Sequence, residues 1–162
     1  MNDIVQNLKD SFSSNKTLDV NWRIQQLNAL EKLLIENEKQ ICDALKIDLN
    51  KHENDSILSE VGMAKNAIIH ALNHIEDYAK PKKVSAQFPI NLAYSTYVQY
   101  QPYGVVLIMG AWNYPFQLCF VPLVGAIASG NCVLIKPSEL AKKSADLIEV
   151  LVTKYLDKVN LQ

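Results

Sequence analysis

The chain has 162 residues and a formal net charge of −1, with 16 lysines and arginines against 17 aspartates and glutamates. One domain of ordinary size can bury a hydrophobic core at this length. The balanced charge argues against a nucleic-acid partner, which would need a basic face or stripe.

The cysteines and the first residues bear on where the protein works. Cys42, Cys119 and Cys132 stand in apolar surroundings, form no CxxC pair and are odd in number. Reduced thiols in a cytosolic protein are the simplest interpretation. The opening MNDIVQNLKD has neither the basic end nor the apolar centre of a signal peptide. These features predict a cytoplasmic protein.

A long segment without charge stands in the second half of the chain. Residues 84–135 contain no charged side chain and no histidine, so they are either buried in a core or placed in a membrane. A membrane-spanning helix needs about 20 consecutive, mostly apolar residues. Glycines, prolines and amides interrupt this segment, Gly110, Asn113 and Pro115 among them. We therefore expect burial, and no membrane partner.

Residues 1–83 show the apolar spacing of helices. A short helix is expected within 1–12, and another from about Leu18, where apolar residues recur at helical spacing up to Leu34. The helix after that should end near Asn50. Each has an apolar stripe and a charged back, which predicts that residues 1–83 form a helical region packed on a larger layer.

A longer helix should follow, capped by Asp55 or Ser56 and stopped by Pro81. His70 and His74 lie one turn apart on it, with Asp77 one turn further on. Two imidazoles on one helical face fit zinc geometry, but position 71 is alanine, so the HExxH pattern of metalloproteases is missing. No closing ligand is evident, and we predict no metal site.

Residues 84–101 have the composition of strands, with β-branched and aromatic residues in alternation. They predict a β-ribbon in which residues 94–100 pair with 84–88 across a turn at 89–91. Both faces of this ribbon are apolar and uncharged. Such a ribbon needs a partner, which is either the rest of its own chain or another subunit.

The segment that organises the chain follows the ribbon. Val105–Met109 and residues 132–135 are short, continuous apolar runs, as in strands of a parallel sheet that are buried on both faces. Residues 116–128 between them are long enough for a crossover helix, which Gly130 can end. A second amphipathic helix should start at Glu139. We predict an α/β fold whose residues 102–162 form the first βαβα half of a Rossmann-like parallel sheet.

The loop at 110–115 occupies the turn from strand to helix, where α/β sheets bind ligands at their carboxyl edge. It lacks the GxGxxG fingerprint. Asn113 carries a carboxamide that can donate to an oxygen that becomes negative during a reaction, the role of an oxyanion hole. Asparagine is also a common turn former, and spacing alone favours that simpler interpretation.

Lys136 stands at the end of the second predicted strand, where dinucleotide folds meet the adenosine ribose. There it can donate to a hydroxyl, and Glu139, one turn into the predicted helix, can accept from one. A lysine also tolerates a 2′-phosphate, so NAD and NADP both fit. The alternative is a solvated ion pair at a helix start, with Glu139 favourable to the helix dipole.

Residues 102–139 carry a family resemblance. Their sequence, PYGVVLIMGAWNYPFQLCFVPLVGAIASGNCVLIKPSE, closely resembles the aldehyde dehydrogenase family, specifically its class 3 or fatty-aldehyde branch. The resemblance implies that Asn113 is the oxyanion donor and that Lys136 and Glu139 hold the adenosine ribose of NAD or NADP. The cofactor cleft is then lined by the backbone around Met109, Gly110, Ala111 and Trp112.

The resemblance also implies a reaction. In that family a cysteine thiolate attacks an aldehyde, hydride passes to the nicotinamide, and a glutamate activates water to release the carboxylic acid. Both residues belong to sequence that follows the matched part. We expect none of the three cysteines to be the nucleophile, because none promises an accessible, electropositive site. The chain is therefore expected to be the N-terminal part of a longer enzyme and inactive alone.

Two further expectations concern assembly. The ribbon at 84–101 resembles part of the family's oligomerisation region, which implies a homo-oligomer. The half-sheet should also expose an apolar edge that favours self-association. The alternative function is a non-enzymatic remnant that acts as an assembly or binding module. The resemblance makes medium or long aliphatic and aromatic aldehydes candidate substrates, and the sequence does not choose among them.

Overall fold

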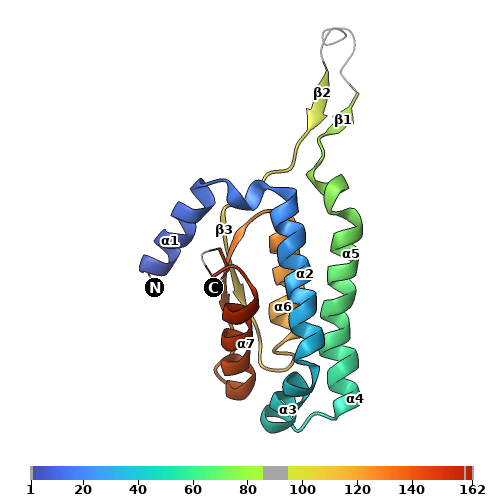
Figure 1. Ribbon diagram of the computed structural model, residues 1–162, viewed down its shortest axis with the longest axis vertical. Helices are drawn as coiled ribbons and strands as arrows, with labels where there is room; N and C mark the ends of the chain where they lie inside the picture. Colours follow the sequence, from blue (N-terminus) through green and yellow to red (C-terminus); the bar gives the residue numbers. More distant parts are fainter. Residues whose placement is uncertain (1, 86–94, 159, 162) are drawn as a thin grey trace.

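A computed structural model describes residues 2–85, 95–158, 160 and 161 (Figure 1). Its elements are helices and two small sheets, which confirms the predicted α/β class. In chain order they are α1 (Asn2–Ser13), a 3₁₀ turn η1 (Lys16–Leu18), α2 (Val20–Glu36), α3 (Glu38–Leu49), α4 (Glu53–Ser56), a π-helical turn η2 (Ile57–Val61), α5 (Gly62–Ala79), β1 (Lys82–Val84), β2 (Thr96–Val98), β3 (Val105–Met109), α6 (Gln117–Ala128), β4 (Cys132–Lys136) and α7 (Lys142–Tyr155).

The predicted parallel sheet forms from β3 and β4, with α6 as the crossover between them. Gly130 ends α6 in the left-handed region, at a φ of 86°, as expected of a glycine after a helix. Leu161 makes a parallel bridge to Val133 of β4. Leu161 thus occupies the place of a third parallel strand beside β4, as expected for the first half of a Rossmann-like sheet.

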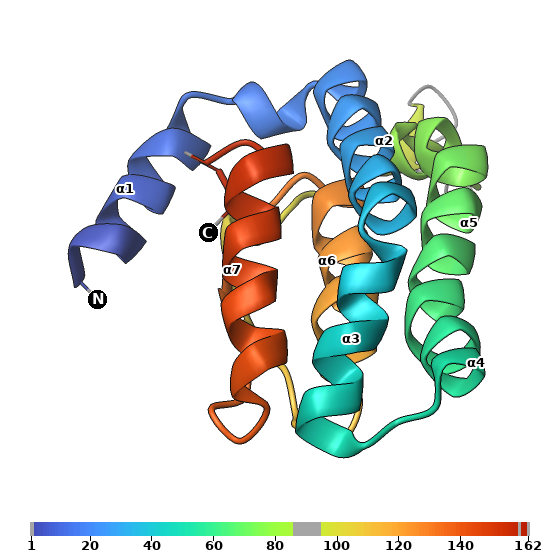
Figure 2. The same ribbon diagram turned by 60° about the horizontal axis from the view of Figure 1, so that its bottom comes forward.

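The core lies between this sheet and the helices. α6 packs on β3 and β4 and is itself covered by α2 and α5, while α3 lies against α7 (Figure 2). The Phe116 and Phe120 rings are fully buried, with ring centroids 5.8 Å apart. The helices of residues 1–83 thus pack on the parallel sheet's own crossover helix, which places one continuous core behind the edge where β3 and β4 end.

The buried side chain of Arg23 links the start of α2 to the last residue of α6. Its Nε donates to the carbonyl oxygen of Thr17 at 2.8 Å, and its Nη1 donates to the carbonyl oxygen of Ala128 at 3.2 Å. Burial lowers the pKa of Arg23, and nearby Asp19 opposes this shift. A Cβ at Gly130 would lie 2.7 Å from the guanidinium, so the turn after α6 needs glycine for space as well as for its backbone angle.

Two predicted helix starts are wrong. The longer helix begins at Glu53, because His52 rather than Asp55 or Ser56 caps it by accepting from the amide of Asn54. It then passes through the π-helical turn η2 before α5. The last helix, α7, begins at Lys142, so Glu139 lies in the loop before the helix and not one turn into it.

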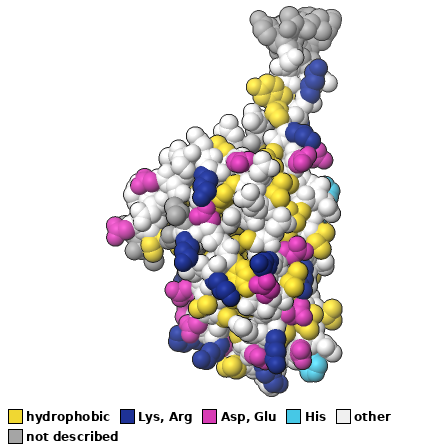
Figure 3. Space-filling view, in the orientation of Figure 1, with side chains coloured by type: hydrophobic (Ala, Val, Ile, Leu, Met, Phe, Trp, Pro, Cys, Tyr) yellow, Lys and Arg dark blue, Asp and Glu magenta, His cyan; other side chains and the backbone are white. Residues whose placement is uncertain are grey.

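The ribbon forms but is not buried. β1 and β2 pair antiparallel, Val84 opposite Thr96, whereas the expected pairing of 86–88 and the turn at 89–91 lie outside the described residues. Figure 1 shows the ribbon projecting from one end of the molecule, and Figure 3 shows apolar side chains on it. Tyr97 is 60% exposed and Tyr100 67%. The expected burial of 84–135 is therefore wrong for most of the described residues 95–103, which are exposed although they carry no charge.

β3 is also more exposed than predicted. Ile108 and Val133 pack under α6, but Leu107 and Met109 on the other face of β3 are 53% and 71% exposed. β3 is therefore buried on one face only, because helix α1, although it contacts both strands, leaves these side chains open. Among the described residues, no helix has the length and hydropathy that a membrane crossing requires.

Candidate functional site

The carboxyl ends of β3 and β4 meet at one edge of the sheet. Met109 and Lys136 are register partners, and the Gly110 amide donates to the carbonyl oxygen of Lys136 at 3.0 Å. The loop at 110–115 and the loop at 137–141 therefore leave the sheet side by side. This edge lies at the opposite end of the molecule from the ribbon (Figure 1). The structure thus brings together the two segments that carry the predicted site residues.

Gly110 lies directly against α6. A Cβ at this position would overlap the Sγ of Cys119, so the chain can turn this closely to the helix only without a side chain. Trp112 and Asn113 further along the loop are exposed. Among the described residues, no hydrogen bond is made by the Asn113 carboxamide. Asn113 lies in a turn, but its side chain does not make the bond to its own backbone that turn-forming asparagines often make.

The start of α6 is capped by a residue distant in the sequence. Glu60 of η2 is fully buried, and its Oε2 accepts from the amides of Phe116 and Gln117 at 3.0 and 3.1 Å. Its Oε1 accepts from Lys51 Nζ at 2.8 Å. The next amides, of residues 118–120, donate to the carbonyl oxygens of Tyr114 and Phe116. A helix start is a common phosphate site, but here a carboxylate already occupies it.

Sequence reasoning missed Glu60 and Lys51. One signal was present, because Glu60 stands three residues after Ile57 and four before Ala64, on the stripe predicted to be apolar. A charged residue in such a stripe must find a partner in the core. Lys51 lies nine residues before Glu60, but the amides that Glu60 caps lie 56 and 57 residues further along the chain, and the sequence does not indicate that contact.

Lys136 and Glu139 form an exposed ion pair at the same edge. Nζ of Lys136 lies 2.9 Å from Oε2 of Glu139, and the side chains are 59% and 78% exposed. The hydrogen bond from Lys136 lowers the pKa of Glu139. The pair therefore offers one donor and one acceptor to a ligand at the carboxyl edge, and it equally fits the solvated pair of the alternative interpretation.

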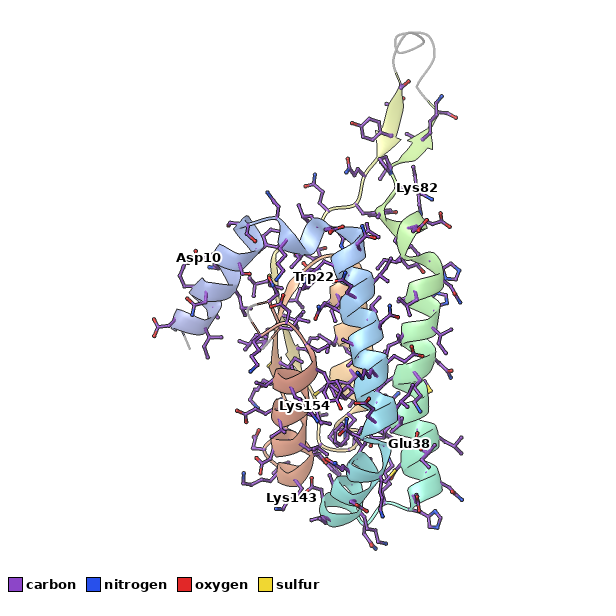
Figure 4. All side chains as sticks on the ribbon, viewed as in Figure 1. Asp10, Trp22, Glu38, Lys82, Lys143 and Lys154 are labelled. Atoms are coloured by element: carbon purple, nitrogen blue, oxygen red, sulfur yellow. The ribbon has the colours of Figure 1, made fainter. Side chains whose placement is uncertain are left out.

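A second acid from the helical region caps α7. Asp48 of α3 accepts from the amides of Lys143 and Ser144 at 3.2 and 2.7 Å. Figure 4 shows Lys143 at the end of α7 that lies next to α3. Both helices that follow a parallel strand are thus started by a carboxylate of residues 1–83, and among the described residues neither takes a side-chain cap from its own N-cap position.

The three thiols lie in settings that disfavour the thiolate. All are buried and reduced. Burial, and then the charge of Glu60, raises the pKa of Cys119 to about 11; burial and Asp157 do the same for Cys132. Burial also raises the pKa of Cys42. Because the thiolate is the nucleophile, these settings support the expectation that none of the three attacks a substrate.

The histidines of α5 stack on each other, with ring centroids 4.4 Å apart. Nδ1 of His74 lies 2.8 Å from the carbonyl oxygen of His70, and Nε2 of His70 lies 3.1 Å from the Tyr78 hydroxyl. In the described residues, no group of three or more His, Cys, Asp or Glu is placed to hold a metal ion.

A hollow of about 1170 Å³ lies at the base of the ribbon, between α5, the end of α6 and residues 99–103. Its lining includes Tyr78, Lys82, Tyr100 and Tyr103. It is at the opposite end of β3 from the loop that carries Asn113, so it belongs to the ribbon and not to the carboxyl edge.

Comparison with known proteins decides the family. Residues 1–158 match the model of the aldehyde dehydrogenase family. The chain belongs to this family. It is 42% identical over 154 residues to aldehyde dehydrogenase family 3 comG of Dictyostelium discoideum, covering 95% of this chain and 33% of that protein. It is 39% identical over 158 residues to the dimeric NADP-preferring aldehyde dehydrogenase of Rattus norvegicus, covering 98% and 35%.

Two solved structures share the fold of this chain. Staphylococcus aureus AldH, solved in a substrate-bound state, superposes with a TM-score of 0.95 at 35% identity, over 99% of this chain and 35% of that one. The glyceraldehyde-3-phosphate dehydrogenase GapN of Methanocaldococcus jannaschii, solved with NADP, is 19% identical with a TM-score of 0.78, a likeness of fold alone. The chain spans about a third of the length of these relatives.

Proposed function

We propose that these 162 residues are the N-terminal, cofactor-binding part of an NAD(P)-dependent aldehyde dehydrogenase, which oxidises aldehydes to carboxylic acids. The observation that carries the proposal is the shared edge of β3 and β4, where the loop with Asn113 and the Lys136–Glu139 pair emerge together. Ligands of α/β folds bind at such an edge. The family membership supplies the reaction class.

In this proposal each segment of the chain has one task. Residues 1–83 support the cofactor domain, 84–101 form the oligomerisation ribbon, and 102–162 form the first half of the cofactor domain. The packing of α2 and α5 on α6 supports the first assignment. The exposed tyrosines of the ribbon support the second, as does the dimeric state in the name of the rat relative. We place the protein in the cytoplasm.

The cofactor is NAD or NADP, which when bound accepts the hydride from the aldehyde carbon. Lys136 donates to the adenosine ribose and Glu139 accepts from it, while the backbone around Met109–Trp112 lines the cleft. The exposure of the Lys136–Glu139 pair supports this role. Because Glu60 already occupies the start of α6, the pyrophosphate is held elsewhere.

Asn113 acts on the substrate. Its carboxamide N–H donates to the aldehyde oxygen as that oxygen becomes negative during nucleophilic attack. An exposed carboxamide without a hydrogen-bond partner among the described residues is ready to make this bond. The thiol nucleophile and the carboxylate that activates water come from residues outside this chain, which agrees with the burial and raised pKa values of Cys119 and Cys132.

The test compares the chain alone with a completed enzyme. The completed enzyme, called the fusion protein below, joins this chain to the part of the rat relative that follows its matched region. Each is mixed with NAD or NADP and an aliphatic or aromatic aldehyde, and reduced dinucleotide is followed by absorbance. We expect turnover by the fusion protein and none by the chain alone. Turnover by the chain alone would refute the proposal, and an inactive but folded fusion protein would favour a non-enzymatic binding module.

A further inference from the structure

The loop at 110–115 is fixed at both ends by contacts that its own sequence does not predict. At its start, the Gly110 amide bonds to Lys136 and the Gly110 backbone packs on Cys119. At its end, the amides of Phe116 and Gln117 bond to the buried Glu60 carboxylate. Asn113 lies midway between these two anchors. Its place relative to the sheet therefore depends on both of them.

Lys51 extends the second anchor to the residue next to Asn113. Its Nζ lies 2.8 Å from Oε1 of Glu60 and 4.0 Å from the centroid of the Tyr114 ring. The Lys51 side chain is only 9% exposed, so water screens neither contact well. In this buried ion pair, the Lys51 ammonium contacts the Tyr114 ring, and the Glu60 carboxylate accepts from the amides of residues 116 and 117.

The backbone around Glu60 also favours a positioning function for the Lys51–Glu60 pair. Glu60 belongs to η2, the π-helical turn between α4 and α5. A π turn adds a residue to a helical turn and redirects the side chains within it, and such turns are frequent at functional sites. Here the redirected side chain is a fully buried carboxylate whose oxygens all face the start of α6 or Lys51.

We propose that the Lys51–Glu60 pair is a positioning device that holds the loop at 110–115 so that the Asn113 carboxamide reaches the reacting aldehyde oxygen. This inference rests on the proposed function, because it assigns the pair an effect that passes through Asn113. Glu60 and Lys51 touch neither substrate nor cofactor in it. They act on the rate by placing another residue, and a misplacement of about 1 Å in an active site costs on the order of 100-fold in rate.

The main variant is Glu60→Gln, which keeps the side-chain shape but loses the charge that binds Lys51 and the two amides. Its matched control is Glu38→Gln, because Glu38 also pairs with a lysine, Lys65, at 2.9 Å, but neither residue makes a hydrogen bond or ion pair to the described residues 110–117. Both are made in the fusion protein with and without Asn113→Ala. For each protein, kcat, the KM for aldehyde and the Kd for the dinucleotide are measured.

We expect Glu60→Gln to lower kcat about 10- to 100-fold with little change in either binding constant, and Glu38→Gln to leave all three unchanged. In the Asn113→Ala background, Glu60→Gln should cost almost nothing further, since the residue it positions is gone. Equal losses of kcat in both backgrounds would show that Glu60 acts on stability alone and would overturn the inference. A folded fusion protein without turnover would instead overturn the proposed function, and an unchanged kcat in Asn113→Ala would overturn only the catalytic role proposed for Asn113.

A second variant keeps the test decisive if Glu60→Gln does not fold. Tyr114→Leu removes the ring under Lys51 at a position that is 37% exposed, so the fold should tolerate it. Tyr114→Leu should lower kcat severalfold in the fusion protein that keeps Asn113, and should not lower it further in the Asn113→Ala background. In the 162-residue chain, amide hydrogen exchange should rise in residues 110–118 and not in α2. Unchanged kcat and exchange in this variant would contradict the proposal.

Discussion

At the scale of single residues, the contact between Gly110 and Cys119 determines which side chains the start of the candidate site can hold. The loop can leave β3 close to α6 only because position 110 has no side chain, and Sγ of Cys119 fills the space that a Cβ would need. The same closeness buries the thiol. Cys119 is therefore a packing residue of the crossover helix. Its place within the predicted crossover helix already indicated this, and the close approach of Gly110 explains it.

Gly110→Ala should destabilise the chain by about 1–3 kcal/mol, the usual cost of overpacking a core. Cys119→Ala, which removes the sulfur, should reduce that cost, so that the double variant is more stable than the sum of the two single changes predicts. Urea unfolding followed by circular dichroism measures all three. Strictly additive losses would show that the glycine is needed for a different reason.

Stability should also depend on alkaline pH through the buried thiols. The folded chain raises the pKa of Cys119 and Cys132 from 9.0 to about 11, so the unfolded chain loses these protons first. The stabilisation is complete below about pH 9 and is lost as pH rises towards 11. A Cys119→Ala, Cys132→Ala variant should therefore lose less stability than the wild type between pH 9 and 11. Parallel curves of unfolding free energy against pH would refute this.

At the scale of elements, the starts of α6 and α7 depend on the helical region. Glu60 and Asp48 satisfy backbone amides that the N-cap residues Phe116 and Ala141 cannot satisfy. A carboxylate at a helix start also complements the helix dipole. The N-terminal helices thus do more than cover the sheet, because they fix the first turn of each helix that follows a strand end.

Asp48→Ala should lower the unfolding free energy by about 0.5–2 kcal/mol, the range for a lost helix cap. Amide exchange should increase mainly in the first turn of α7, where Lys143 and Ser144 lose the charged acceptor. Asp43→Ala on the same helix α3 serves as a control. Equal exchange in the first turn of α7 for both variants would show that the Asp48 cap contributes nothing.

The same elements show what the sequence could predict. The two parallel strands, the crossover helix and the stop at Gly130 follow from local pattern and are confirmed, because apolar runs and turn residues act over a few positions. The start of α7 at Lys142 was missed because its cap, Asp48, lies far away in the chain. Glu60 was missed for the same reason. The catalytic role of Asn113 stays a prediction that depends on the family resemblance, since spacing alone favours a turn-forming residue.

At the scale of the whole molecule, the ribbon and the candidate site lie at opposite ends (Figure 1). The ribbon exposes Tyr97, Val98 and Tyr100 on short strands, and exposed apolar strands favour association. A contact made there leaves the edge with Asn113 open to cofactor and aldehyde. The two functions assigned to the chain therefore do not compete for surface.

Sedimentation of the chain over a range of concentrations should show self-association that Tyr97→Glu weakens. Glutamate at this position lies opposite Lys83 in the ribbon, so the ribbon itself should remain paired. Leu58→Glu places the same charge on an apolar side chain that is 73% exposed on η2 and should leave association unchanged. A chain that stays monomeric at every concentration, or equal effects of both variants, would contradict this function of the ribbon.

The most direct test of the account is kcat of the fusion protein with and without Asn113→Ala. The account predicts that kcat falls about 100- to 1,000-fold, the usual cost of losing one oxyanion donor. The Kd for the dinucleotide should not change, because Lys136 and Glu139 remain in place. An Asn113→Ala protein that turns over aldehyde at the wild-type rate would show that Asn113 only shapes the turn, and that the catalytic role assigned to this edge is wrong.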